Sequence, residues 1–256
     1  MNNDAAGYPS LEQQVVFITG GGSGIGAALT RAFHLQGATV AFVDIDDAAS
    51  KALVETLKEE TGRMPHYRHC DIRDVEDLQA AIAEVGRDLG AIHTLINNAA
   101  NDDRHTWEEV DVAYWDERMA INLRPMFFAA QAAAHQMIKA GGGSIINFGS
   151  ISVRMAIGDL SAYMTAKAAA HGLTRSLARD LGKHNIRVNT LVPGSIMTER
   201  QLEKWIGPDE EASIQAHQCL KIRLVPEHVA PLALFLASQQ SLAISGQEIA
   251  VDGGWG

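Results

Sequence analysis

The sequence predicts one α/β domain built on a doubly wound parallel sheet of about seven strands, with helices on both faces. Short runs of β-branched and apolar residues alternate with longer helical patterns throughout the 256 residues. Strands that are apolar at nearly every position are typical of parallel sheets buried on both faces. Crossovers between parallel strands are right-handed almost without exception, which favours the doubly wound topology. No internal repeat, low-complexity linker or domain boundary interrupts the pattern, so residues 1–256 are expected to form a single domain.

The expected strands and helices follow one another in regular order. Strands are predicted at residues 14–20, 38–44, 65–71, 92–98, 143–149, 186–192 and 247–253. Helices are predicted at residues 24–37, 46–62 and about 112–139. The first two end at Gly37 and Gly62, and glycine is a common helix stop signal. Residues 198–227 break the rhythm, because a helical pattern is interrupted at Gly207-Pro208 and no strand follows at once, and we expect a substrate lid there.

The composition argues against several classes of protein. The formal net charge is −10, from 31 acidic and 21 basic side chains without a basic run, so no nucleic-acid partner is expected. No apolar run of about 18 residues is present, so no membrane span is expected. The polar start lacks the features of a secretion signal, and two cysteines, Cys70 and Cys219, suit a reducing cytoplasm. The ten histidines are scattered without matching acidic ligands, so no metal site is expected.

A glycine-rich stretch, residues 19–26, connects the first predicted strand to the first predicted helix. Glycines permit a tight turn, let the backbone approach a pyrophosphate, and leave helix N-terminal amides aimed at its negative charge. In this strand–turn–helix context the stretch predicts a dinucleotide site on a Rossmann-like fold. The expected cofactor contacts are Gly20, Ser23, Gly24, Ile25 and Gly26.

Asp44 ends the second predicted strand, 24 positions after Gly20. A carboxylate at this point can accept both ribose hydroxyls of an adenosine and would repel a 2′-phosphate. No Arg or Lys follows in residues 45–47, so NAD is expected rather than NADP. Helix capping is an alternative role for Asp44, but Asp46 and Asp47 are better placed for it.

Tyr163 and Lys167 lie four positions apart in an alanine-rich helical segment and therefore share a helix face. An ammonium beside a phenol favours the phenolate, so the pKa of Tyr163 is expected to be lowered. Tyr163 could then take the proton of an alcohol while a hydride leaves the carbon. Ser150 stands 13 residues earlier, at the end of the fifth predicted strand, where its hydroxyl could hydrogen-bond the same oxygen. No GxSxG motif is present, so serine acyl chemistry is not expected.

The spacing of the glycine stretch resembles the TGxxxGxG loop of the short-chain dehydrogenase/reductase family. Asp44, the segment NNAA at 97–100, Ser150 and the Tyr163-x-x-x-Lys167 pattern follow in order, so the resemblance covers nearly the whole chain. By this resemblance Tyr163 is the acid/base, Lys167 lowers its pKa and binds the nicotinamide ribose, and Ser150 orients the substrate. Asn122 matches the helix asparagine that supports a water-linked proton path to the lysine.

The same resemblance implies further contacts with the cofactor. Asp71 and Ile72 would border the adenine, and Pro193, Ile196 and Thr198 would lie beside the nicotinamide carboxamide. The residues expected along the cofactor are Asn97, Asn98, Ala99 and Ala100. The family's usual NNAG is NNAA here, and the additional methyl group is expected to be tolerated.

Three segments are expected to determine the choice of substrate: the loop after residue 100, the loop between Ser150 and Tyr163, and the lid. Their polar and aromatic residues include Asn101, Asp102, Asp103, Arg104, His105, Arg154, Asp159, Arg200, Gln201 and Trp205. Such groups suit a sugar or polyol better than a steroid. Residues 101–123, 146–152, 200–205 and 218–227 resemble bacterial NAD-dependent D-xylose and related aldose 1-dehydrogenases, which oxidise the anomeric carbon to a lactone. The predicted substrate contacts are Asn101, Ser150, Ser152, Arg154, Tyr163, Gln201 and Trp205.

Two alternatives stay open at this point. Arg154, four residues after Ser150, could pair with a carboxylate, which would make the substrate a sugar acid such as a 2-keto-3-deoxy acid. A catalytically silent NAD sensor on the same fold is the second alternative, although such a protein is expected to lack Tyr163 or Lys167.

The resemblance also implies a homotetramer. The small-residue helix face after Tyr163 and the helix at 112–139 are expected to pack against further copies of the chain. The residues of that small face are Ala166, Ala169, Ala170 and Leu173. Trp255 is expected to cover the pocket of a neighbouring subunit.

Overall fold

The computed structural model describes residues 6–155 and 157–255, and these form one seven-stranded parallel sheet. The strands follow the order β3-β2-β1-β4-β5-β6-β7 across the sheet. Their bounds are β1 Val15–Thr19, β2 Thr39–Asp44, β3 His66–His69, β4 Ile92–Asn97, β5 Gly143–Phe148, β6 Ile186–Pro193 and β7 Glu248–Val251. The predicted fold class is confirmed, and the strands lie where the sequence predicts them, although β1, β3 and β7 are shorter than predicted at both ends.

Helices connect these strands. The α-helices are α1 Gly24–Leu35, α2 Asp47–Thr61, α3 Val75–Asp88, α4 Val112–Asn122, α5 Arg124–Ala140, α6 Ser152–Met155, α7 Ser161–Leu181, α8 Glu199–Lys204, α9 Pro208–His217 and α10 Ala230–Ala237. Short 3-10 helices lie at Pro9–Leu11, Trp107–Glu109, Gly182–His184, Pro226–His228 and Gln239–Ser241. Within the described residues no helix combines the length and the apolar content needed to cross a bilayer.

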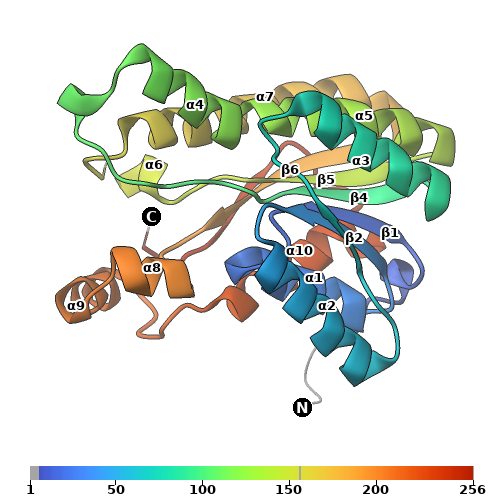
Figure 1. Ribbon diagram of the computed structural model, residues 1–256, viewed down its shortest axis with the longest axis horizontal. Helices are drawn as coiled ribbons and strands as arrows, with labels where there is room; N and C mark the ends of the chain where they lie inside the picture. Colours follow the sequence, from blue (N-terminus) through green and yellow to red (C-terminus); the bar gives the residue numbers. More distant parts are fainter. Residues whose placement is uncertain (1–5, 156, 256) are drawn as a thin grey trace.

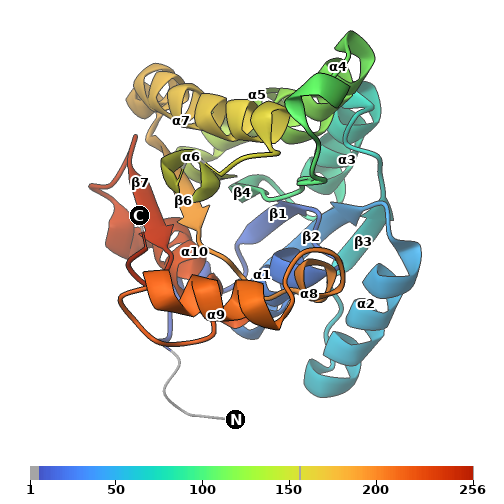
Figure 2. The ribbon, with the colours of Figure 1, turned by 90° about the vertical axis from the view of Figure 1, so that its left-hand side faces the viewer.

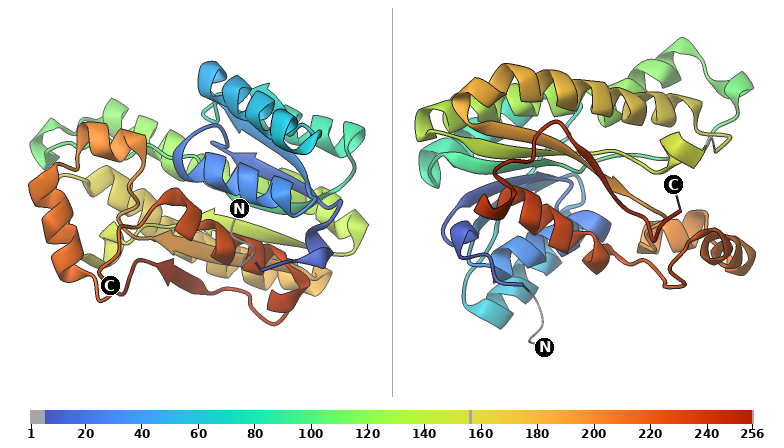
Figure 3. Two further views of the ribbon diagram at one scale, coloured as in Figure 1. Left: turned by 90° about the horizontal axis from the view of Figure 1, so that it is seen from below. Right: turned by 180° about the vertical axis from the view of Figure 1, so that it is seen from behind.

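The helices cover both faces of the sheet, so the fold has three layers (Figure 1). One face carries α3, α4, α5 and α7, and the other carries α1, α2 and α10. On the second face α1 and α10 lie side by side (Figure 3). Each face has its own apolar core: Phe33 and Leu236 belong to the core under α1 and α10, and Leu78 and Met137 to the core under α3 and α5. Burial of strands from both sides explains why their sequences are apolar almost throughout.

The prediction of one long helix from about Val112 to Lys139 is wrong, because the structure has two helices in this range. The helix α4 ends at Asn122 and α5 begins at Arg124, with the backbone at Leu123 outside helical geometry (φ −133°, ψ −55°). Pro125 explains the break, since proline has no N–H to donate and its ring crowds the carbonyl of the preceding turn. Both penalties vanish at the start of a helix, which is where Pro125 stands.

The helix α7 carries Tyr163 and Lys167 and packs against α4 and β6. Ala166 and Ala170, which were expected to face another subunit, are fully buried within their own chain, so that part of the expectation is wrong. Small side chains at this spacing allow neighbouring elements to pack closely on the helix. Ala166 and Ala170 therefore belong to the internal core. Ala169 and Leu173 remain partly exposed, so contact of these two residues with another subunit stays a prediction.

The predicted lid region contains α8 and α9, which project from the body of the domain next to its C-terminus (Figures 1 and 2). Thr198 caps the N-terminus of α8, where its hydroxyl accepts a hydrogen bond from the backbone N–H of Gln201. The Gly207-Pro208 interruption separates α8 from α9, with Pro208 as the first residue of α9. The predicted lid region therefore contains two short helices joined at Gly207-Pro208, and its closure over a substrate stays a prediction.

Candidate active site

The strand order reverses at β1, which has β2 on one side and β4 on the other. Open parallel sheets bind ligands outside the carboxyl ends of their strands at such a point. Thr19 Oγ1, at the end of β1, accepts hydrogen bonds from the backbone N–H groups of Asn98 and Ala99, each at 3.1 Å. The Asn98 amide donates to the carbonyl of Gly20 at 2.9 Å. The loops that leave β1 and β4 are thus fixed against each other.

The glycines of the loop after β1 are required by the space around them. Gly20 has φ +65°, in the left-handed region that favours glycine. A Cβ atom on Gly26 would lie 1.7 Å from the carbonyl oxygen of Gly20, and one on Gly22 would lie 2.2 Å from the hydroxyl oxygen of Ser50. The side chain of Ser23 does not cap α1, so the first-turn amides keep their capacity to bind an anion. The loop fits the pyrophosphate of a dinucleotide.

Asp44 links this loop to the start of α2. One carboxylate oxygen accepts from the N–H of Gly22 at 2.9 Å, and the other accepts from the N–H of Asp46 at 3.0 Å. Asp46, not Asp44, caps α2, since its side chain accepts from the N–H of Ala49. The partly buried carboxylate of Asp44 retains further acceptor positions, which suit the ribose hydroxyls of an adenosine.

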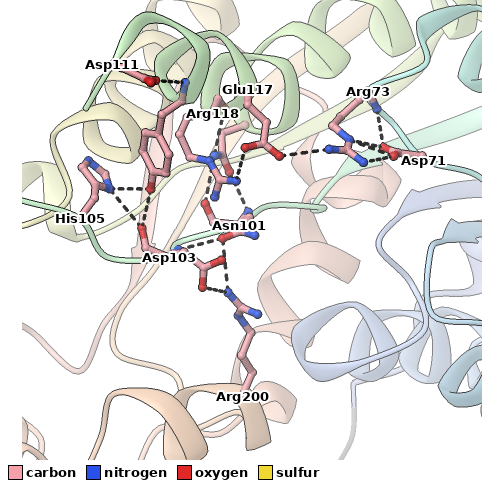
Figure 4. Close-up of polar contacts among 11 residues, drawn as sticks. Asp71, Arg73, Asn101, Asp103, His105, Asp111, Glu117, Arg118 and Arg200 are labelled. Atoms are coloured by element: carbon pink, nitrogen blue, oxygen red, sulfur yellow. Dashed lines mark hydrogen bonds and ion pairs between the residues drawn. The ribbon is translucent and has the colours of Figure 1, made fainter. Parts of the chain in front are cut away.

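Asp71, after β3, forms a forked ion pair with Arg73 (Figure 4). The Nε atom of Arg73 lies 3.0 and 2.9 Å from the two carboxylate oxygens, and these contacts hold the pKa of Asp71 below its usual value. Ile72 is buried against the core of β1 and β2. Contact of Asp71 and Ile72 with an adenine stays a prediction.

The segment from Pro193 to Thr198 leads from β6 to the lid. A Cβ atom on Gly24 would lie 3.3 Å from the methyl carbon of Thr198, so Thr198 lies next to the glycine loop. Ile196 is buried in the core of the α1 face. The segment therefore lies between the glycine loop and the lid. A segment that contacts the nicotinamide is expected in this position.

Asn97, which was expected along the cofactor, faces the core instead. Its side chain is buried and donates to Asn147 Oδ1 at 2.8 Å and to the carbonyl of Met126 at 3.2 Å. Successive residues of an extended chain point to opposite sides, so Asn97 points inward and Asn98 reaches the glycine loop. Ala100 is exposed, with room for the methyl group that replaces the family's glycine.

Tyr163, Lys167 and Ser150 meet near the end of β5. Lys167 is fully buried; its Nζ donates to the carbonyl of Phe148 at 2.9 Å and lies 5.7 Å from the centroid of the Tyr163 ring. Ser150 follows β5, and its hydroxyl lies close enough to Tyr163 to lower the pKa of the phenol. The Ser150 and Ser152 hydroxyls lie 2.8 Å apart, so Ser152 helps to hold Ser150 in place. The structure thus brings together the residues predicted to carry the chemistry.

The electrostatic setting of Tyr163 differs from the expectation. Burial raises the pKa of Tyr163 above its usual range, the charge of Asp102 adds to this effect, and the hydrogen bond with Ser150 opposes it. The net shift of the Tyr163 pKa is therefore upward, opposite to the expected lowering, because loss of solvent around the phenolate is its largest cause. Burial also lowers the pKa of Lys167 to about 8, with Asp102 opposing. At pH 7 the two groups are therefore a neutral phenol and a mostly protonated lysine.

Asn122 is fully buried and holds the loop after β4. Its Oδ1 accepts from the backbone N–H of Asn101 at 2.9 Å, and its Nδ2 donates to the carbonyl of Asn101 at 3.0 Å. These reciprocal bonds position the loop at the entrance to the site. The expected part of Asn122 in a water-linked proton path stays a prediction.

The loop after β4 is tied to the lid by polar contacts (Figure 4). Asp103 Oδ1 lies 2.7 Å from the Arg200 guanidinium and 3.1 Å from Lys204 Nζ. The neighbouring Asp102 accepts a short hydrogen bond from Gln201 Nε2 and lies 3.5 Å from Arg200 Nε. The first turns of α8 are thus held over the loop that leads into the site.

Trp205 and Gln201 line a small cavity of about 200 Å³ under the lid. The Arg104 guanidinium lies 5.2 Å from the centroid of the Trp205 ring. Trp255 lines the same cavity and stacks on His217 of its own chain, with ring centroids 5.5 Å apart. Trp255 thus packs against the lid region of its own chain, and its expected cover of a neighbouring subunit's pocket stays a prediction. A larger cavity, about 400 Å³, lies beside β2 and β3 and contains none of the predicted site residues.

Arg154 already has an acidic neighbour within the chain. Its guanidinium lies 3.9 Å from the carboxylate of Glu248, which also contacts His171 at 2.7 Å. This arrangement does not favour Arg154 as the binding group for a substrate carboxylate. Across residues 6–155 and 157–255 no group of three or more His, Cys, Asp or Glu side chains is arranged to hold a metal.

Two roles were missed by sequence reasoning. No role was predicted for Thr19, the first residue of the glycine-rich stretch. Its hydroxyl nevertheless joins the loops after β1 and β4. A threonine at the end of the strand before a glycine turn is the signal that could have indicated this. Asp102 was one of many polar loop residues, and only the folded arrangement brings its charge close to Tyr163 and Lys167.

Known proteins resemble the chain over nearly its full length. A family model described as "Enoyl-(Acyl carrier protein) reductase" matches residues 20–256. The chain is 52% identical over 248 residues to the D-xylose 1-dehydrogenase of Caulobacter vibrioides (strain NA1000 / CB15N), covering 97% of this chain and 98% of that protein. It is 48% identical over 247 residues to a Rhizobium meliloti (strain 1021) protein named "Probable galactose dehydrogenase GalD", covering 96% of each. A solved 7α-hydroxysteroid dehydrogenase complexed with NADH and 7-oxo glycochenodeoxycholic acid has a TM-score of 0.91 at 31% identity, over 96% of each chain.

The dinucleotide loop and the Ser150–Tyr163–Lys167 group on a doubly wound sheet define a nicotinamide-dependent oxidoreductase that acts on CH–OH groups. The chain belongs to the short-chain dehydrogenase/reductase family. The resemblance to D-xylose 1-dehydrogenases that the sequence indicated is confirmed by the identity over nearly the full length.

Proposed function

We propose that this protein oxidises the C1 hydroxyl of an aldose, such as D-xylose, to the lactone with NAD. The observation that carries the proposal is the placement of Ser150, Tyr163 and Lys167 near the carboxyl end of β5, at the same edge of the parallel sheet as the glycine loop that follows β1. Relatives that match the chain from end to end are named for the aldoses xylose and galactose, which supports this substrate class. A cyclic aldose carries a hydroxyl and a hydrogen on C1, so its oxidation gives a lactone directly.

The chain's own residues then divide the work. Bound NAD supplies an acceptor for the hydride of C1, and the glycine loop and Asp44 would hold it. Tyr163 acts as the base in its phenolate form, after its own phenolic proton has left to solvent. The phenolate Oη then receives the proton of the C1 hydroxyl, and Ser150 orients that hydroxyl through a hydrogen bond. Because burial makes the phenolate of Tyr163 unfavourable, a neighbouring positive charge is needed as the phenol changes protonation state. Lys167, buried 5.7 Å from the ring centroid, supplies that charge.

The preference for NAD over NADP rests on Asp44. Its carboxylate is fixed by the N–H groups of Gly22 and Asp46, so it cannot swing away from a 2′-phosphate without losing both bonds. A fixed negative charge at this position repels a phosphate and accepts hydroxyls.

The two alternatives have less support. A sugar-acid substrate required Arg154 as its binding group, and that guanidinium lies beside Glu248. A silent sensor does not need a buried lysine beside a tyrosine, an arrangement that is expensive to desolvate and is typical of catalytic sites.

Assembly as a homotetramer in the cytoplasm is part of the proposal. Apolar side chains of α4 and α5 that stay exposed in the single chain, including Trp115, Phe127 and Ile138, support contact through these helices. Both Cys70 and Cys219 are free thiols, as suits a reducing compartment.

The test is NADH formation, followed by absorbance, with D-xylose, D-galactose, L-arabinose, L-fucose, L-rhamnose and the corresponding 3-deoxy-2-keto acids. At least one aldose is expected to be oxidised more efficiently than every acid. Tyr163→Phe is expected to lower kcat by about 10² to 10⁴ while NADH binding persists. Oxidation of an acid but of no aldose would refute the substrate class, and full turnover by Tyr163→Phe would refute the mechanism.

A further inference from the structure

Asp102 and Asp103 are neighbours in the loop after β4, but they have different partners. Asp103 contacts two cations of the lid, Arg200 at 2.7 Å and Lys204 at 3.1 Å. These ion pairs neutralise the charge of Asp103 and hold α8 against the loop after β4. Asp102 contacts Arg200 Nε only at 3.5 Å, and its short hydrogen bond comes from the neutral amide of Gln201.

Asp102 lies close enough to the catalytic residues for its charge to act on them. Its negative charge acts on both Tyr163 and Lys167, raising the pKa of each. Its side chain is 26% exposed, so the carboxylate stays within reach of a molecule that enters the site. Gln201, which binds Asp102, also lines the cavity beneath the lid. Asp102 therefore stands between the reacting groups and the lid.

A carboxylate in this position has acceptor capacity to spare. Ionised carboxylates offer about four acceptor positions, and the contacts with Gln201 and Arg200 occupy two of those of Asp102. Hydroxyl groups donate short, charge-assisted hydrogen bonds to carboxylates, and a sugar presents several such donors on one ring. An apolar substrate would instead strip water from the carboxylate without replacing its hydrogen bonds.

We propose that Asp102 is a specificity-determining residue that accepts hydrogen bonds from the ring hydroxyls of the sugar, with Gln201 holding its carboxylate toward the substrate. The inference rests on the proposed aldose oxidation and adds the residue that selects a polyhydroxylated substrate. It also gives the two neighbouring aspartates different roles: Asp103 anchors the lid, and Asp102 recognises the sugar.

The experiment combines deoxygenated sugars with two matched variants. The kcat/KM values of D-xylose and its 2-deoxy, 3-deoxy and 4-deoxy analogues are measured for the wild type, Asp102→Asn and the control Asp103→Asn. The wild type is expected to lose about tenfold or more with at least one analogue, because a partly buried acceptor then loses its donor. Asp102→Asn is expected to lower kcat/KM for D-xylose and to treat that analogue within about threefold of D-xylose. Asp103→Asn is expected to keep the wild-type ratio between the two sugars, since it weakens the lid for every substrate alike.

Each outcome decides the inference. If Asp102→Asn keeps the wild-type ratios for all three analogues, Asp102 does not recognise the hydroxyls, although aldose oxidation by the wild type still supports the proposed function. If Asp103→Asn changes the ratio as much as Asp102→Asn does, the division of tasks is wrong. If Asp102→Asn does not fold, Asp102→Glu provides the same comparison with a displaced carboxylate. A wild type that oxidises all three analogues as well as D-xylose overturns the inference without any variant, and a wild type inactive on every aldose overturns the proposed function itself.

Discussion

The Nζ of Lys167 donates a hydrogen bond to the carbonyl oxygen of Phe148 at 2.9 Å, which joins the middle of α7 to the end of β5. The acceptor, Phe148, is two residues before Ser150 in the chain, and Lys167 is about one helical turn after Tyr163. The bond therefore holds the ammonium close to both residues. The lysine is fully buried, and burial lowers its pKa from 10.5 to about 8. The catalytic arrangement therefore contains a buried cation whose cost depends on pH.

Lys167→Met is expected to change the pH dependence of stability. The unfolded chain binds a proton at Lys167 up to pH 10.5, whereas the folded chain releases it at about pH 8, so raising the pH from 8 to 10 favours the folded wild type. Below pH 8 the wild type carries the full penalty. The stability advantage of Lys167→Met over the wild type should therefore shrink by about 1 to 3 kcal/mol between pH 7 and pH 10. Urea unfolding at several pH values measures this difference, and parallel curves for both proteins would contradict it.

Arg200→Ala is expected to weaken substrate binding more than stability. Arg200 is 42% exposed and its partner Asp103 is 37% exposed, so the ion pair contributes less than about 1 kcal/mol to folding. It does join α8 to the loop after β4, so the KM for the sugar should rise several-fold while the melting temperature changes little. Arg223→Ala is the matched control, because Arg223 pairs with Glu211 inside the lid. A similar rise in KM for both variants would show that the contact with the loop is not what matters.

Much of the fold could be predicted because its signals are local. The glycine loop, the strand ends at Asp44 and Ser150, and the spacing of Tyr163 and Lys167 can each be recognised in a few neighbouring residues. The contact between Asp103 and Arg200 could not be predicted from the sequence, because it joins residues that are 97 positions apart. The pKa of Tyr163 was also beyond the sequence, since it depends on how much protein surrounds the phenol, and spacing says nothing about that.

The helix errors have a different cause. Pro125 was visible in the sequence, but the apolar pattern continues on both sides of it and suggested one helix. Ala166 and Ala170 lie on a face of small residues, which fits an interface between subunits as well as a tight internal contact. Only the position of α7 between α4 and β6 decides in favour of the internal contact.

Asp44→Ser is expected to change the choice of cofactor. The substitution removes the negative charge that repels a 2′-phosphate and the acceptor that binds the ribose hydroxyls. The ratio of kcat/KM for NAD to that for NADP should fall by about tenfold or more. Loss of the hydrogen bonds from Gly22 and Asp46 should also lower the free energy of unfolding by about 1 to 2 kcal/mol. The control Asp47→Asn removes a charge from the neighbouring first turn of α2 and is expected to leave the ratio of NAD to NADP use unchanged. An equal shift in both variants would mean that the overall negative charge of this region, and not contact of Asp44 with the cofactor, sets the preference.

His105 is expected to position the start of α7. Its side chain is buried, and its Nε2 accepts a hydrogen bond from the backbone N–H of Ala162 at 3.2 Å, next to Tyr163. Because Nε2 accepts, the ring proton is assigned to Nδ1, which lies 3.2 Å from the carbonyl of Asp103 and 2.9 Å from the hydroxyl of Tyr114 (Figure 4). The imidazole thus links the loop after β4 to the helix that carries the catalytic tyrosine.

His105→Leu leaves the N–H of Ala162 buried without an acceptor, which should lower the free energy of unfolding by about 1 to 3 kcal/mol. The displaced start of α7 should also lower kcat, while the KM for NAD stays the same because the glycine loop is not touched. His105→Gln restores an acceptor at the same distance along the side chain and is expected to recover most of the kcat. Urea unfolding and steady-state kinetics of the three proteins measure both effects. Equal losses in the Leu and Gln variants would mean that the shape of the ring, and not the acceptor at Nε2, holds Tyr163 in place.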